Sequence, residues 1–377
     1  MSKNVFIDNL LEKPSYGWQD AEGNLIVPST RQLWAEAGRR INIFKSRRNW
    51  ISAISVIMMT CMIPFAVAFG RNYFSWPLAI GAVAYGMVVM GTHGTVWFHR
   101  YCTHRAYTFR HPLVRILTQH LVIKTFPEEM YVISHHVHHV KSDLPGDPYN
   151  PQGGLMYCML SETNHHSINK NLCEAHYAKA ARFMQHTGVQ INSYPQYQRW
   201  GSVATPAYTI FTWLINWAFW YTAFYFIGGH ALATALFSGA LLWYVGVRAF
   251  NYTGHGKGEV KHKDGIDFDR SNLSINQSRP GLLAGEWHNN HHLYPGSARA
   301  GFLKGQLDLA WMYIYGLYKL KLVTSYKDSK SEFLRKYALK GHARDMKPLS
   351  GTAYTRAQLE EESRTRAEGS RSLEERA

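Results

Sequence analysis

The sequence predicts an all-α, multipass membrane protein with four transmembrane helices in two hairpins and a helical cap on one side of the membrane. Two observations support this fold class. Four long, uncharged, apolar runs occur as two close pairs in the 377-residue chain, and three clusters of histidine lie just after or between those pairs. The 20 histidines are the most unusual feature of the composition.

The first pair of apolar runs covers residues 51–70 and 76–98, and only the segment RNYFS separates them. About 20 apolar residues at about 1.5 Å per residue cross a bilayer core of roughly 30 Å. The pair therefore predicts a transmembrane hairpin. Buried helices of a soluble protein are the alternative, and four uncharged runs of this length disfavour it.

The second pair covers residues 206–227 and 231–250, joined by GGH, and predicts a second hairpin. Lys and Arg gather before residue 51 and after residues 98 and 250, whereas the two turns hold one Arg and no Lys. Basic residues favour the cytoplasmic side. We therefore expect the termini and all the polar regions in the cytoplasm.

These segments divide the chain into three parts. Residues 1–50 form a cytoplasmic amino-terminal segment without signal-peptide features, in which RQLWAEAGRRINIF predicts a short amphipathic helix. Residues 51–352 form the main domain, which holds all four apolar runs and the histidine clusters, with further helices expected at 111–126 and 302–322. Residues 353–377 are rich in charge and poor in large apolar side chains, so we expect a disordered tail.

Composition narrows the classes of partner. The formal charge of +15 suits a membrane surface, an anionic substrate or an acidic protein, and no nucleic-acid motif accompanies it, so we expect no nucleic acid partner. The four cysteines have no C-x-x-C spacing, which argues against a zinc ribbon or a disulfide framework.

The histidine clusters have the spacing of metal ligands. Residues i, i+3 and i+4 share one face of a helix, so H-x-x-H-H can direct three imidazoles to one spot. The first cluster differs, because i and i+5 lie about 140° apart on an α-helix and must straddle a site or end the helix. The candidate ligands from spacing are His99, His104, His135, His138, His139, His288, His291 and His292.

Eight imidazoles on one side of a membrane exceed the four ligands of a structural zinc, so they predict two metals with open positions. Neutral imidazole suits zinc, copper, nickel and iron, and the H-E-x-x-H signature of zinc hydrolases is absent. Two E-x-x-H matches, at Glu162–His165 and Glu259–His262, lie in polar segments, and we treat them as coincidence. A di-iron site that activates O2 on a membrane-dissolved substrate is the best interpretation.

The motifs resemble those of the integral-membrane fatty acid desaturases, most closely the acyl-CoA Δ9 (stearoyl-CoA) branch. The family pattern H-x4-H, H-x-x-H-H and H-x-x-H-H occurs in order between Gly91 and Pro295, and HRYCTHRAY is similar to the first box of that branch. Asn290 stands where animal enzymes commonly have an aromatic residue. The resemblance therefore favours a bacterial-type protein of the cytoplasmic membrane over one of the endoplasmic reticulum.

The resemblance adds a ninth ligand. Asn251 and His255 in RAFNYTGHGKG match the family's N-x-x-x-H, in which the histidine binds metal and the asparagine holds a metal-bound water. DPYN, Asp147 to Asn150, resembles the D-P-x-N that follows the second box. The implied ligands are His99, His104, His135, His138, His139, His255, His288, His291 and His292.

The implied reaction uses two iron ions, O2 and two electrons to place a cis double bond in a saturated acyl chain. No H-P-G-G segment of a fused cytochrome b5 occurs, so we expect a separate donor such as cytochrome b5 or a ferredoxin. Residues 153–202 do not align with the family's headgroup-binding region. The acyl carrier therefore stays open between CoA, acyl carrier protein and a glycerolipid.

Two rival hypotheses remain. A hydroxylase, acetylenase or other lipid oxygenase would share the scaffold and the first hydrogen abstraction, and the motifs do not separate these outcomes. A non-catalytic membrane metal-binding or transport protein would carry its histidines within the helices along a pathway. Nearly all of the histidines in this chain lie beyond the predicted helix ends, which disfavours that class.

Overall fold

The computed structural model describes residues 5–261, 267–268, 272–276 and 287–337. It is mostly helical with one small sheet. The predicted tail at 353–377 lies outside the described residues. The α-helices are α1 Val5–Asp8, α2 Thr30–Ile41, α3 Trp50–Ala68, α4 Trp76–Ala84, α5 Gly91–Gly94, α6 Pro112–Gln119, α7 Glu128–Lys141, α8 Leu155–His165, α9 Glu174–Met184, α10 Tyr194–Trp200, α11 Pro206–Thr253, α12 His288–Leu293, α13 Leu309–Lys319 and α14 Lys330–Phe333.

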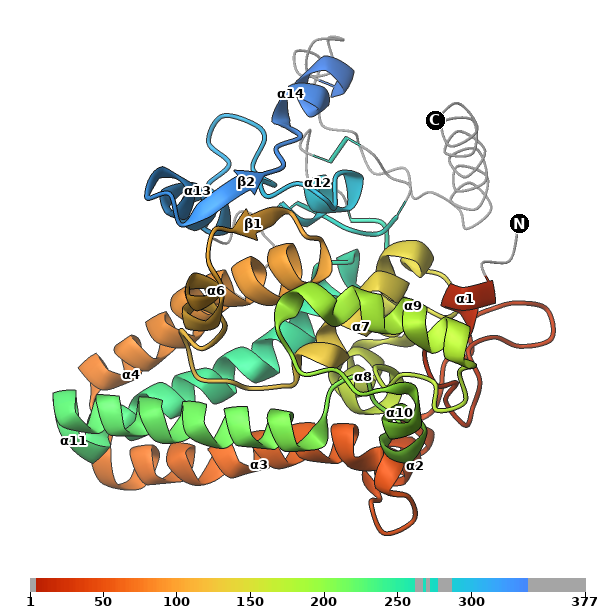
Figure 1. Ribbon diagram of the computed structural model, residues 1–377, viewed down its shortest axis with the longest axis horizontal. Helices are drawn as coiled ribbons and strands as arrows, with labels where there is room; N and C mark the ends of the chain where they lie inside the picture. The colour runs from red at the N-terminus through yellow and green to blue at the C-terminus, as the bar shows by residue number, and fades with distance from the viewer. Residues whose placement is uncertain (1–4, 262–266, 269–271, 277–286, 338–377) are drawn as a thin grey trace.

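Within the described residues, three helical segments are long and apolar enough to cross a membrane. They are Arg47–Tyr73, Trp76–Thr103 and Pro206–Thr253, and their mean hydropathies are 2.2, 1.3 and 1.4. The third has 48 residues but breaks at Gly228 and Gly229, where the backbone angles are not helical. Figure 1 shows α11 running out beside α3 and folding back on itself at its far end. The break falls between the two runs that the sequence separates at GGH.

The long helices approach each other closely where glycine removes the side chain. A Cβ atom on Gly86 would lie 2.2 Å from the backbone oxygen of Gly239, and one on Gly239 would lie 2.2 Å from that of Ala82. Small residues allow this kind of backbone contact between membrane helices. These glycines therefore set the distance between the helical segment Trp76–Thr103 and the part of α11 that follows its break.

A two-stranded antiparallel sheet departs from the predicted all-α class. Strand β1, Tyr107–Phe109, pairs with β2, Val323–Tyr326, and Tyr107 lies opposite Tyr326. Both strands are only three or four residues long, and their burial does not alternate along the strand, so they give no periodic signal. The all-α prediction is therefore wrong for these two segments.

The shorter helices gather at one end of the long ones (Figure 1). The helix expected near residues 31–44 is α2, which begins at a capping box formed by Ser29 and Gln32. The helices expected at 111–126 and 302–322 are shorter than predicted, as α6 and α13. The segment 153–202, which the motifs leave unassigned, folds mainly as α8, α9 and α10 and packs against α2, α7 and the long helices.

Candidate metal centre

The first histidine box lies on a π-helical segment. Residues Thr95–Thr103 form this segment, and the backbone N–H of His104 donates to the carbonyl of His99 at 3.1 Å, an i to i+5 bond. A π-turn closes after five residues and brings i and i+5 to the same side. This turn resolves the 140° separation that an α-helix would impose on His99 and His104.

The second and third boxes lie on α7 and α12, and the structure divides each triad between two groups of histidines. His135 and His139 face the first group, whereas His138 faces the second. His288 and His292 face the second group, whereas His291 faces the first. The expectation that each triad converges on one spot is therefore wrong: i and i+4 stay together and i+3 points to the other group.

All nine predicted histidines meet in these two groups. Within each group the candidate ligand atoms lie within 4.8 Å of one another. The first group is His99, His104, His135, His139 and His291, and the second is His138, His255, His288 and His292.

The ring nitrogens face one another at distances that suit a bound cation. In the first group the Nε2 atom of His291 lies 2.7 Å from that of His99 and 3.0 Å from that of His139. In the second, the Nε2 atom of His288 lies 2.9 Å from that of His255 and 3.1 Å from that of His292. Imidazole nitrogens about 2.1 Å from a shared ion are separated by roughly 3 Å.

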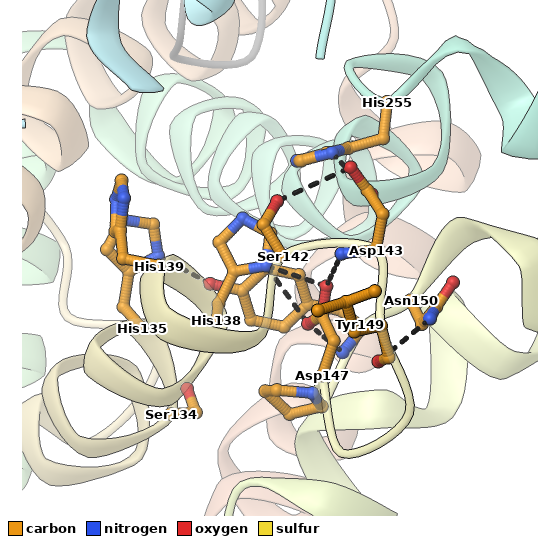
Figure 2. A network of polar contacts seen from close by, with 12 residues as sticks. Ser134, His135, His138, His139, Ser142, Asp143, Asp147, Tyr149, Asn150 and His255 are labelled. Atoms are coloured by element: carbon orange, nitrogen blue, oxygen red, sulfur yellow. Dashed lines mark hydrogen bonds and ion pairs between the residues drawn. The ribbon is translucent and has the colours of Figure 1, made fainter. Parts of the chain in front are cut away.

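The other ring nitrogen, Nδ1, of three of these histidines contacts a polar side chain, and this contact favours a free lone pair on Nε2. His138 Nδ1 lies 3.0 Å from both carboxylate oxygens of Asp147, and His255 Nδ1 lies 2.9 Å from Asp143 Oδ1. Figure 2 shows both aspartates on the loop after α7, with Tyr149 beside His138 and hydrogen-bonded to His135 Nδ1. An Nδ1–H that donates to a carboxylate leaves a lone pair on Nε2, which is the arrangement of metal-ligating histidine.

Burial favours the neutral imidazoles that metals require. Desolvation, then the neighbouring His255, lowers the pKa of His138 well below its ordinary value, and desolvation does the same for the pKa of His288 and His291. The pKa of His139 falls to about 3 for the same reason. Lone pairs held 3 Å apart without protons repel each other, so the two groups fit metal ions.

A cavity adjoins the histidines on the side of the long helices. Its wall includes His99, His135, His138 and His288, and Asn251 of α11 also lines it. The structure therefore places Asn251 next to the candidate ligands. Phe126, Met130 and Phe250 supply apolar wall.

Within the described residues, neither E-x-x-H match contributes a side chain to the two histidine groups. Glu162 lines the cavity but pairs with Arg248 Nη2 at 3.0 Å, and His165 Nδ1 bonds the carbonyl of Pro148 at 2.7 Å. Of the second match, His262 lies outside the described residues. The interpretation of Glu162–His165 as coincidence agrees with this geometry.

The sequence pattern of one family, described as Fatty acid desaturase, matches residues 74–302. The chain belongs to the fatty acid desaturase family. This desaturase is 27% identical over 288 residues to an sn-1 stearoyl-lipid 9-desaturase of Anabaena variabilis, covering 75% of this chain and 95% of that protein. It is 26% identical to an icosanoyl-CoA 5-desaturase of Limnanthes douglasii, covering 74% of this chain and 72% of that protein. A hex-5-enoyl-[acyl-carrier protein] acetylenase of Moorena producens (strain JHB) is 29% identical, covering 66% and 76%.

The predicted family and the predicted enzyme class are thus confirmed, because the chain is a desaturase and desaturases are oxidoreductases. Sequence reasoning missed Asp143 and Tyr149 as partners of ligand histidines and noted Asp147 only within DPYN. A signal was present for the aspartates, because two of them, four residues apart, follow within eight residues of the histidine triad. Nothing in the spacing distinguished Tyr149.

Proposed function

We propose that this desaturase places a cis double bond in a saturated fatty acyl chain, using O2 and two iron ions held by the nine histidines. The observation that supports it is the pair of buried and half-buried histidine groups, with five and four members, beside a cavity at the end of membrane-length helices. Iron is the metal of choice because imidazole ligands with open positions suit redox chemistry with O2.

The proposed topology has four membrane spans in two hairpins, with the termini and the metal centre in the cytoplasm. The length of α11 supports the fourth span, because 48 residues at about 1.5 Å per residue far exceed a bilayer core of roughly 30 Å. The break at Gly228–Gly229 supplies the turn. The basic residues around the open ends of both hairpins support the cytoplasmic side.

Bound iron would supply the oxidant that removes hydrogen from the acyl chain. The chain's own residues hold and orient the site. Asp147 would keep the Nδ1 proton of His138, so that its Nε2 faces inward, and the Asp143 carboxylate lies beside His255 Nδ1 at 2.9 Å. The apolar wall of the cavity would hold the acyl chain and exclude water from the reacting carbons. Asn251 would hold a water at the metals.

The substrate would be an acyl chain linked to CoA, acyl carrier protein or a glycerolipid, drawn from the lipid bilayer. Electrons would come from a separate protein such as cytochrome b5 or a ferredoxin, and the bacterial cytoplasmic membrane is the proposed location. A second candidate function is an acetylenase, hydroxylase or other oxygenase on the same scaffold. The similarity to a relative named as an acetylenase favours retaining it.

Product mapping tests the proposal. The chain is expressed in a host supplied with a saturated fatty acid and a competent donor, and the lipids are analysed by mass spectrometry. A new double bond at one position is the expected result. A triple bond or a hydroxy acid would move the assignment to the second candidate, and no product would contradict both.

The matched variant is His291→Ala, because His291 lies between His99 and His139 in the first group. Product should disappear and bound iron should fall. His230→Ala is the control, since His230 bonds Tyr221 at the far break of α11 and lies outside both groups. Iron and product that survive His291→Ala would refute the ligand assignment.

A further inference from the structure

A basic hollow of about 500 Å³ opens beside the histidine groups. Its four cations are Arg105, Lys179, Arg182 and Lys327, and all four are exposed. Within the described part of the chain, its wall includes no Asp or Glu and none of the four cations forms an ion pair with a carboxylate. The described residues of the hollow therefore present unneutralised positive charge.

The inner wall of the hollow reaches the candidate metal ligands. His104 of the first group lines it, and so does His136, the one histidine of HHVHH outside both groups. The His136 ring stacks on Phe183 with ring centres 4.0 Å apart and lies 6.5 Å from the His104 ring. A chain of aromatic rings thus connects the surface of the hollow to the metal centre.

The hollow and the cavity that adjoins the other histidines share no lining residue. On α7, His135 lines the cavity whereas the next residue, His136, lines the hollow. An acyl chain in the cavity would therefore leave the hollow open. A second reactant could reach the metal centre while the substrate is bound.

We propose that this basic hollow is the docking surface for an acidic one-electron carrier protein. The inference rests on the proposed function, which needs two electrons for each double bond. The acyl chain gives up two hydrogens, and O2 accepts these with two electrons and two protons to form two waters. Each electron would leave a reduced carrier, which becomes oxidised, and would pass to iron held by the two histidine groups. Complementary charge would steer the carrier and orient its redox group toward the His136 ring.

The test measures carrier binding without turnover. The full-length, iron-loaded protein in nanodiscs is titrated with an oxidised plant-type ferredoxin and with the haem domain of cytochrome b5. The variant is Arg182→Glu, and the control is Arg31→Glu on α2, an exposed arginine with the same change of charge. Iron content and thermal midpoint report whether each variant is folded and loaded.

Arg182→Glu should raise the Kd of at least one carrier by roughly tenfold and reduce its salt dependence, whereas Arg31→Glu should change it less than about twofold. An unchanged Kd in Arg182→Glu, or no carrier binding by the wild type at low salt, would overturn the proposal. In a parallel titration with CoA, loss of CoA binding by Arg182→Glu with carrier binding intact would also overturn the proposal and identify a phosphate site. Dithionite-driven desaturation by the wild type tests the proposed function separately, since it needs no carrier.

Discussion

The carboxylate of Asp147 provides a sharp test of how the chain holds the second histidine group. Its two oxygens accept from three donors: His138 Nδ1 at 3.0 Å, the backbone N–H of Asp143 at 2.9 Å and that of Tyr149 at 3.1 Å. Asp147→Asn keeps one acceptor oxygen and replaces the other by an NH2 group. We expect this variant to bind metal more weakly in the second group.

The size of the effect follows from these contacts. The new NH2 group would face either the Asp143 N–H or the Tyr149 N–H, and a buried donor left without an acceptor costs about 1 to 3 kcal/mol. The Nδ1 proton of His138 also loses a charged partner. Loss of such a partner typically weakens metal binding about 10- to 100-fold, which is about 1.4 to 2.8 kcal/mol.

The assay is iron affinity measured by chelator competition, with iron per chain measured by mass spectrometry. Tyr149→Phe is the matched comparison, because it removes the partner of His135 in the first group and leaves Asp147 intact. Asp328→Asn is the surface control, since Asp328 is exposed. Unchanged iron affinity in Asp147→Asn would refute the orienting role of this carboxylate.

Three other predictions concern stability in detergent. Gly239→Ala should lower the free energy of unfolding by about 1 to 3 kcal/mol, because its Cβ would lie 2.2 Å from the Ala82 oxygen, whereas Gly81→Ala meets nothing within 4 Å and should be neutral by thermal unfolding. Burial raises the pKa of Glu129 from 4.5 to about 7, so the folded state binds more protons and stability should fall by about 3 kcal/mol as pH rises from 4.5 to 7. Glu129→Gln should lack this pH dependence, and an equal slope in both proteins would contradict the assignment. Removing metal with a chelator should lower the thermal midpoint, and an unchanged midpoint would argue against a structural contribution from the ions.

Much of the scaffold was predictable because apolar length is a property of sequence alone. The runs at 51–70 and 76–98 lie inside helices Arg47–Tyr73 and Trp76–Thr103, and the GGH turn coincides with the break in α11. The strands β1 and β2 were not predictable, since each pairs with a segment more than 200 residues away and has too few residues for a pattern.

The sequence predicts which histidines form the site, but not how they are arranged in space. Spacing selects eight histidines, and resemblance adds His255. For His99 and His104 the sequence left two arrangements open, and the helix ends between them at Thr103, in a π-turn that the spacing did not predict. The division of each triad depends on where α12 lies against α7, which spacing along one helix cannot encode.

The pairing of β1 with β2 also fixes the order in which the protein is completed. Tyr107 follows the first histidine box by three residues, yet its partner Tyr326 is made more than 200 residues later. The neighbouring bond from Lys327 N–H to the Ala106 carbonyl joins the same two regions. During synthesis, the strand that follows the first histidine box therefore stays without its partner until all nine predicted ligands have been made. A chain released before β2 would hold every one of these histidines but lack the pairing that joins the end of the first box to residues 323–327.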